Sequence, residues 1–353
     1  MRIMLDSGAY SAWTQGVEVD LDEYITYIKR NAACISTYVN LDVIAGGQRE
    51  SRPEQIESAA ARSYANQQAM KDAGLRPIPV FHEDERWCWL ERYLDDGEPY
   101  VGLAAKSQQR QEAIRWLDGC FDLIANGSRP LIKVHGFGLT ALLICQRYPW
   151  ATVDSSRWAK AAGFGLMPIP VWINGRPDYS VQPTTVSLSR AGGHKHVDTL
   201  DDWELDRVRR YLNDVVGIDM AEARYSPVHR WRAWITYFQG VETMCSGRLC
   251  SPLLQHASQQ FRPADHSFQI AFVTDTTRKQ AELLAECGVQ RRLLSFYKLK
   301  DQPDATLEDY VAGRMRPAKP RRKQPMDWYS DRYIASRKLA VYQRLKGYEG
   351  RME

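Results

Sequence analysis

The chain has 353 residues, of which 44% are hydrophobic and 25% are charged, and its formal net charge is +4. These are ordinary globular values, and the length suits one barrel-sized domain with additions or two smaller domains. No apolar run reaches about 18 residues and charged residues begin at position 2, so we expect neither a membrane span nor a secretion signal.

Strand and helix patterns alternate along the first half of the chain. Short β-branched or apolar runs predict strands, and the longer segments between them predict helices. The expected strands are 3–5, 35–42, 77–82, 100–104, 131–135 and 152–154, and the expected helices are 21–33, 53–73, 86–94, 109–117 and 140–146. This alternation indicates an α/β protein with a parallel sheet, and we expect a (β/α)8 TIM barrel.

The alternation stops after residue 158. A hairpin of 167–173 with 184–188 is expected across the Asn-Gly turn at 174–177, followed by helices at 201–215 and 228–244. Strands at 267–274 and 291–297, with a helix at 278–287 between them, would complete eight strands. We therefore expect a barrel domain over 1–300 with a mostly helical insertion at about 175–265, and a basic C-terminal extension over 301–353.

The extension is rich in positive charge. Six of the ten residues from Arg314 to Lys323 are Lys or Arg, and prolines interrupt them. A phosphate-contacting arm and a solvated tail are both open readings of this pattern. Arg157 and the stretch 190–196 add further positive charge that a polyanion would meet.

Three aspartates, Asp6, Asp42 and Asp154, fall at the C-terminal ends of expected strands. In a barrel of parallel strands this is the edge that carries catalytic residues. Two facing carboxylates can divide the roles of nucleophile and proton carrier, and a third can accept hydrogen bonds from a guanine edge. The alternative is that each aspartate caps a helix.

Glycines and histidines also mark the strand ends. Gly8 and Gly102, with Leu103, would let the backbone approach a ligand closely, although a glycine in a strand often only accommodates packing. His82 and His135 would bind substrate or phosphate, or serve the fold alone.

The spacing of the cysteines gives only weak indications of disulfides or of a metal site. Seven cysteines without framework spacing favour a reducing cytoplasm over disulfides. Cys245, Cys250, His256 and Cys287 are possible zinc ligands, but the spacing is loose and buried thiols are the simpler interpretation. No redox cofactor is expected.

Several of these motifs resemble the tRNA-guanine transglycosylase superfamily in order and spacing. Residues 6–10 are similar to its Asp-Ser-Gly-Gly-Tyr/Phe motif, 101–104 to its Gly-Gly-Leu-Ala loop, and 135–138 to a Gly-x-Gly before the nucleophile strand. Asp154 falls at the nucleophile, and 296–297 is similar to a late Phe-Tyr strand. The resemblance covers about residues 1–160 and again about 290–300.

The resemblance implies a TIM barrel and a base-exchange reaction. It implies that Asp154 is the nucleophile, that Asp6 transfers protons, and that Asp42 reads the base with the backbone of Gly102 and Leu103. It also places Ser7 and Gly8 of the first motif among the substrate contacts.

The chain departs from the tRNA enzymes in ways that change the expected substrate. The segment preceding the first motif and the Cys-x-Cys-x-x-Cys zinc site are absent, and Asp154 is followed by Ser-Ser-Arg-Trp. This pattern looks more like the phage branch that puts 7-deazaguanines into DNA. The expected function is therefore exchange of guanine in DNA for a 7-deazaguanine, in the cytoplasm of the host if the protein is phage-encoded.

Three alternatives remain open at the level of sequence. The substrate could be tRNA, the carboxylates could belong to an unrelated barrel hydrolase, or the protein could bind DNA without catalysis. The sequence leaves the oligomeric state open.

Overall fold

The computed structural model describes residues 2–46, 51–106, 110–125, 132–188, 195–246, 268–274, 278–300 and residue 307. They belong to one compact unit, Met1–Arg314. The expected arm at 314–323 lies outside the described residues.

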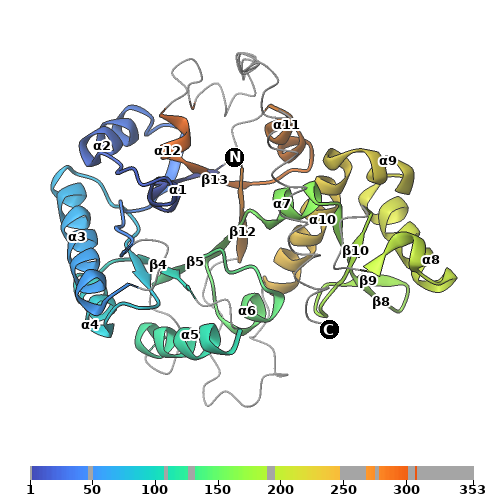
Figure 1. Cartoon of the computed structure of the whole chain (residues 1–353), viewed down its shortest axis with the longest axis horizontal. Coiled ribbons are helices and arrows are strands. Elements are labelled where there is room, and N and C mark those ends of the chain that lie inside the picture. Colours follow the sequence, from blue (N-terminus) through green and yellow to red (C-terminus); the bar gives the residue numbers. More distant parts are fainter. Residues whose placement is uncertain are drawn as a thin grey trace, which may run out of the picture. The chain divides into compact units, whose positions relative to one another are not determined.

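A curled eight-stranded sheet forms the centre of this unit (Figure 1). Its order is β2-β1-β13-β12-β6-β5-β4-β3, and every neighbouring pair is parallel. The strands are β1 Arg2–Asp6, β2 Ile35–Tyr38, β3 Val80–His82, β4 Tyr100–Ala104, β5 Lys133–Phe137, β6 Thr152–Ser155, β12 Gln269–Val273 and β13 Arg291–Ser295. The expected α/β class with a parallel sheet is confirmed.

The two edge strands, β2 and β3, meet just beyond their ends. Val39 and Ile78 form a parallel bridge. The N–H of Asn40 donates to the carbonyl of Ile78 at 2.8 Å, and the N–H of Ile78 donates to the carbonyl of Tyr38 at 2.9 Å. The edges of the sheet are thus linked by short backbone hydrogen bonds.

Helices follow the strands and surround them in Figure 1. They are α1 Ala9–Thr14, α2 Leu21–Arg30, α3 Pro53–Asp72, α4 Trp87–Asp95, α5 Arg110–Ala125, α6 Leu142–Arg147, α7 Arg157–Gly163, α10 Pro227–Cys245, α11 Arg278–Glu286 and α12 Phe296–Leu299. Alternate strand residues face opposite sides, so two apolar layers form. Leu103, Val134 and Val153 pack toward the helices, whereas Met4, Val80 and Leu293 pack on the other face of the sheet.

The sequence patterns placed the eight strands correctly but erred at several ends. Helix α5 continues to Ala125, beyond the expected end at 117, because its apolar face stays buried through Phe121 and Ile124. Residues 296–297 begin α12 and do not continue the expected strand. The reason is that the buried ring of Phe296 packs against Tyr24 and Tyr27 of α2, at 5.0 and 5.1 Å between ring centroids.

The segment between β6 and β12 contains strands as well as the expected helices. It comprises β7 Leu166–Ile169, β8 Val171–Ile173, β9 Arg176–Asp178, β10 Thr184–Ser187, β11 Lys195–His196, the 3-10 turn Val197–Thr199, α8 Asp202–Arg210, the π-helical turn Tyr211–Val216 and α9 Met220–Tyr225, before α10. The expected antiparallel pairing is confirmed for β7 with β10. The turn at Asn174 and Gly175, both at positive φ, instead closes the shorter hairpin β8–β9.

Across the described ranges, every helix is too short or too polar to span a bilayer.

Candidate active site

The structure brings the three strand-end aspartates, Asp6, Asp42 and Asp154, into electrostatic contact. Asp6 ends β1, Asp42 follows β2, and Asp154 lies in β6. Burial and the negative charges of Asp42 and Asp154 raise the pKa of Asp6 to about 7. Strands distant in the chain therefore deliver their carboxylates to one shared region, as expected for a parallel sheet.

The turn after β1 holds Asp6 and reaches toward Asp42. The N–H of Gly8 donates to Oδ2 of Asp6 at 3.2 Å, and Oγ of the buried Ser7 donates to Oδ1 of Asp42 at 3.3 Å. Gly8 has φ +79°, and a Cβ there would lie 2.4 Å from Oγ of Ser295 and 2.5 Å from Cβ of Tyr297. The close approach that Gly8 permits is therefore to the end of β13.

His82 lies between two carboxylates. Its Nε2 is 3.1 Å from Oδ2 of Asp42, and its Nδ1 is 2.9 Å from Oε1 of Glu85. Burial by itself would lower the pKa of His82, but the hydrogen bonds and charges of Asp42 and Glu85 outweigh it and raise the pKa to about 10. His82 is therefore an imidazolium at neutral pH, and both of its N–H groups hold carboxylates in place.

Asp154 is held through one of its two oxygens. Its Oδ1 accepts the backbone N–H of Gly138 at 2.8 Å, and Nε2 of His135 lies 3.4 Å from the same oxygen. Within the described part of the chain, Oδ2 has no hydrogen-bond partner. Asp154 is only 8% exposed, so this second oxygen meets little competition from bulk water.

A buried polar chain lies behind His135. Oγ1 of Thr152 is 2.5 Å from Nδ1 of His135 and 2.5 Å from the hydroxyl of Tyr100. One threonine hydroxyl can donate to the ring nitrogen while it accepts from Tyr100. In that arrangement His135 carries its proton on Nε2, which is the nitrogen that faces Asp154.

The expected base-binding pair Gly102 and Leu103 lies inside β4. Leu103 is fully buried on the helix-facing side. Gly102 accommodates the ring of Phe137, because a Cβ there would lie 2.4 Å from Cε2 of that ring. The same ring meets His135 edge-on, with 4.3 Å between ring centroids. Gly102 thus lets Phe137 pack next to the histidine that supports Asp154.

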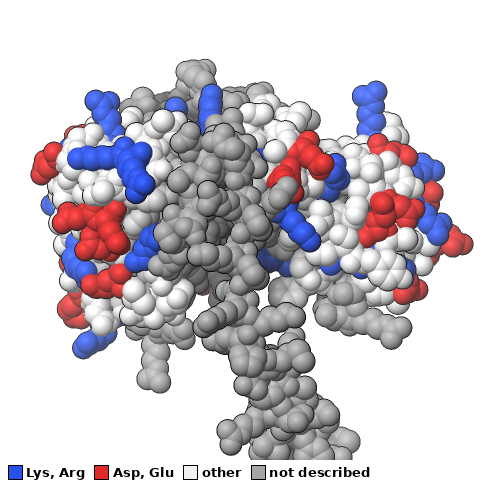
Figure 2. Space-filling view, turned by 90° about the horizontal axis from the view of Figure 1, so that it is seen from above, with Lys and Arg blue, Asp and Glu red and all other residues white. Residues whose placement is uncertain are grey.

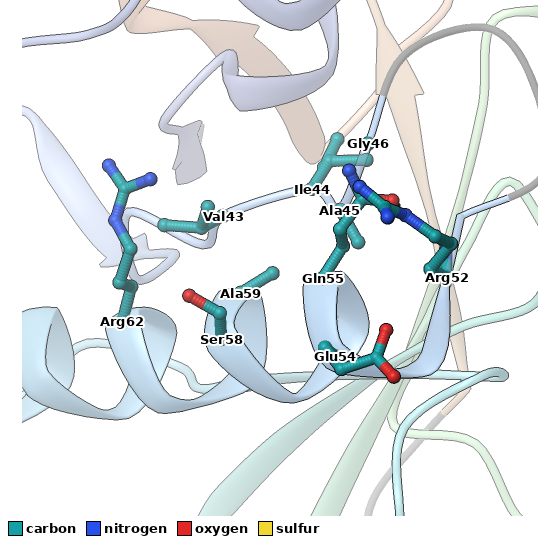
Figure 3. A pocket seen from close by; sticks show the side chains of 10 residues that line it. All are labelled: Val43, Ile44, Ala45, Gly46, Arg52, Glu54, Gln55, Ser58, Ala59 and Arg62. Atoms are coloured by element: carbon teal, nitrogen blue, oxygen red, sulfur yellow. The ribbon is translucent and has the colours of Figure 1, made fainter.

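A cavity of about 440 Å³ lies next to Asp42 in the chain. It is lined by the loop 43–46, which directly follows Asp42, and by the first turns of α3 (Figure 3). None of these residues belongs to the motifs found in the sequence.

The possible zinc ligands are only partly described. Cys245 and Cys287 are half-buried, and Cys250 and His256 lie outside the described residues. Among the residues with a described structure, no cluster of three metal-binding side chains is found.

The basic residues expected near the site are placed in part. Arg157 is exposed, and its guanidinium lies 5.7 Å from the ring of Trp234. Residues 190–194 lie outside the described ranges. On the face shown in Figure 2, Lys and Arg alternate with Asp and Glu, so no single charge dominates the described surface there.

Sequence reasoning missed Glu85, Tyr100 and Thr152 as site residues. Glu85 follows His82 by three residues, a spacing that can bring two side chains of one turn together. Tyr100 and Thr152 occupy strand positions two residues before Gly102 and Asp154, and so share a sheet face with them. This two-residue alternation along a strand was the pattern from which Tyr100 and Thr152 could have been predicted as site residues.

No protein-family model matches the chain, and no curated protein matches it.

Proposed function

We propose that this protein is a transglycosylase that exchanges guanine in DNA for a 7-deazaguanine, such as 7-cyano-7-deazaguanine, on a complete (β/α)8 barrel. The parallel bridge between Val39 and Ile78 supports the barrel, since it links the sheet edges. The observation that carries the function is the grouping of a candidate acid/base, Asp6, with two further carboxylates. Ser7, the residue after Asp6, donates to Asp42, and Asp154 lies in β6 of the same sheet.

Asp154 is the nucleophile in this proposal. Its Oδ2 attacks the anomeric carbon of the target deoxyribose as the bond from that carbon to N9 of guanine breaks. The N–H of Gly138 holds Oδ1 by a hydrogen bond, and Nε2 of His135 lies 3.4 Å from the same oxygen, so the attacking oxygen needs little reorientation. The product is a covalent glycosyl ester, which the incoming base then displaces.

Asp6 carries the proton. With a pKa of about 7, it is present in both forms near neutral pH, which is the condition that favours general acid–base catalysis. The protonated form of Asp6 donates its proton to the departing guanine. The ionised form takes the proton from N9 of the incoming base. Both bases occupy the same place in turn, so one carboxyl group serves both steps.

Asp42 reads the base. A guanine or 7-deazaguanine edge presents an N–H and an exocyclic amino group, and a carboxylate offers two acceptor oxygens to them. Ser7 and His82 each donate to one oxygen of Asp42 and fix its orientation, while a second lone pair of each oxygen remains for the base.

The polynucleotide substrate is proposed from the motifs and from Tyr10. The target nucleotide must leave the stack before its anomeric carbon is accessible. Tyr10 lies in the first turn of α1, four residues after Asp6, and is 67% exposed, so its ring is available to stack on a base. DNA is chosen over tRNA because the His-Gly-Phe-Gly of residues 135–138 and the Asp-Ser-Ser-Arg-Trp of residues 154–158 resemble the phage branch that modifies DNA.

The test is incorporation of a labelled 7-deazaguanine, first 7-cyano-7-deazaguanine, into DNA and separately into tRNA. We expect label in DNA that disappears in Asp154→Asn. Label in tRNA alone would support the mechanism and overturn the assignment of DNA as the substrate. No label in either, from folded protein and a panel of 7-deazaguanines, would overturn the transglycosylase proposal and favour a hydrolase.

A further inference from the structure

The cavity that follows Asp42 is lined on one side by loop 43–46 and on the other by α3. Figure 3 shows Arg52 and Arg62 at opposite ends of the α3 side, with Ser58 and Gln55 between them. The volume of about 440 Å³ is large enough for a phosphate group with part of its sugar.

The positive charges at this cavity are available to a ligand. Arg52 makes no ion pair with any described residue. Arg62 pairs with Glu18 at 3.3 Å, but the two side chains are 59% and 87% exposed, so the pair is weak and easily replaced. The carboxylate of Glu54 extends below Arg52 in Figure 3, away from the loop.

The uncharged lining groups suit the same ligand. Ser58 and Gln55 are exposed, and both can donate hydrogen bonds. Gln55 uses its Oε1 to accept the N–H of Arg52 at 2.9 Å, which leaves its amide N–H groups as donors. Hydroxyl and amide donors with a guanidinium group at either end match the phosphate oxygens along a polynucleotide backbone.

Specific contacts hold the cavity in place after Asp42. The N–H of Val43, the next residue, donates to Oγ of Ser63 on α3 at 2.8 Å. Nε1 of Trp13 donates to the carbonyl of Gly46 at 2.6 Å. Both ends of the loop are thus tied to helices, so the cavity exists before a ligand arrives.

We propose that this cavity is a subsite for backbone phosphates of the nucleic-acid strand, next to the nucleotide whose base is exchanged. The inference rests on the proposed function for the identity of the strand. Arg52 and Arg62 each bind a phosphate and fix the register of the strand, and Asp42 then meets the base of the neighbouring nucleotide. Phosphate contacts of this kind position a substrate without reading its sequence.

The experiment measures binding of a fluorescent single-stranded DNA oligonucleotide by anisotropy over a range of salt concentrations. The variants are Arg52→Gln, Arg62→Gln and their double substitution. Arg115→Gln is the matched control, because Arg115 is an exposed arginine on α5 with no described ion pair. Arg52→Lys keeps the charge but removes the bidentate geometry.

We expect the double variant to bind about tenfold more weakly at low salt. The slope of log affinity against log salt should fall by about 0.7 for each arginine that no longer binds a phosphate. Arg52→Lys should keep the slope and have a reduced affinity. Affinity and slope equal to those of Arg115→Gln would overturn the subsite.

Two further readouts separate the possible failures. If wild-type protein incorporates no 7-deazaguanine but the arginine variants still bind the oligonucleotide more weakly, the proposed reaction fails and the phosphate subsite stands. Deoxyguanosine monophosphate serves as a competitor. Arginine-dependent binding of this mononucleotide, without arginine-dependent binding of the oligonucleotide, would overturn the assignment to a strand.

Discussion

The backbone N–H of Gly138 donates to Oδ1 of Asp154 at 2.8 Å and joins the turn after β5 to the strand β6. Gly138 has φ +67°, a conformation that glycine adopts without strain. One oxygen of Asp154 is thereby occupied, and the other remains for chemistry.

Asp154→Asn should abolish base exchange, with a reduction on the order of 10⁴-fold or more, because an amide is a poor nucleophile. Since Oδ1 can still accept from Gly138, the fold and DNA affinity should be nearly unchanged. Labelled-base incorporation and trapping of the covalent DNA adduct measure the effect. Asp178→Asn, in the β8–β9 hairpin, is the matched control, and turnover retained by Asp154→Asn would remove its role as nucleophile.

Asp6→Asn should stabilise the protein, and this test does not depend on the function. The folded-state pKa of Asp6, about 7, lies above its unfolded value of 3.8, so its contribution to stability is full below pH 3.8 and is lost as pH rises to about 7. The variant should gain roughly 4 kcal/mol well above pH 7 relative to wild type. Denaturant unfolding from pH 4 to 8 measures this, and a pH-independent difference would show that the pKa of Asp6 is not raised in the folded protein.

The same pKa predicts opposite pH responses in the two half-reactions. Release of guanine needs protonated Asp6 and should slow above about pH 7, whereas attack by the incoming base needs ionised Asp6 and should slow below it. Single-turnover measurements of each step, on both sides of neutral pH, test this. Parallel responses of both steps would assign the proton transfer to another group.

His82→Gln should destabilise the protein by roughly 3 kcal/mol, because two buried carboxylates lose their shared cation. The folded pKa of His82, about 10, exceeds its unfolded value of 6.5. The stabilisation by His82 is therefore full below pH 6.5 and is lost as pH rises toward 10, so the unfolding free energies of wild type and variant should converge in that range. His229→Gln, at a more exposed histidine, is the control for generic removal of a ring.

Thr152→Val should lower kcat about 10- to 100-fold with little change in KM, because His135 loses the partner that places its proton on Nε2. Tyr100→Phe should have a smaller effect in the same direction. Thr37→Val is the matched control, since the buried hydroxyl of Thr37 has no partner in the described structure. An unchanged kcat in Thr152→Val would make the polar chain purely structural.

Gly8→Ala should destabilise the protein by roughly 2 kcal/mol or more, because it adds positive-φ strain and a Cβ placed 2.4 Å from Oγ of Ser295. Gly16→Ala has a similar φ, +66°, with open space around its Cβ, so it should show the strain alone. Thermal unfolding of both variants separates the two causes. Equal destabilisation would mean that the contact with β13 relaxes without cost.

The local patterns of the sequence were sufficient for the strand and helix order. Period-2 and β-branched runs predicted the strands, and the position of Asp6, Asp42 and Asp154 at strand ends predicted a shared edge. These features depend on residues near one another in the chain, so they are visible without a structure. The Asn174–Gly175 turn was likewise predictable, although not which strands it joins.

Only the tertiary structure decided which side chains meet. His82 reaches Asp42 across 40 positions and Thr152 reaches His135 across 17, because strand register, set by the packing of the whole sheet, aligns them. The pKa of Asp6 likewise follows from burial and from charges on other strands. Gly8 and Gly102 were predicted as ligand contacts, but their close neighbours are Ser295 and Phe137, which no local pattern could show.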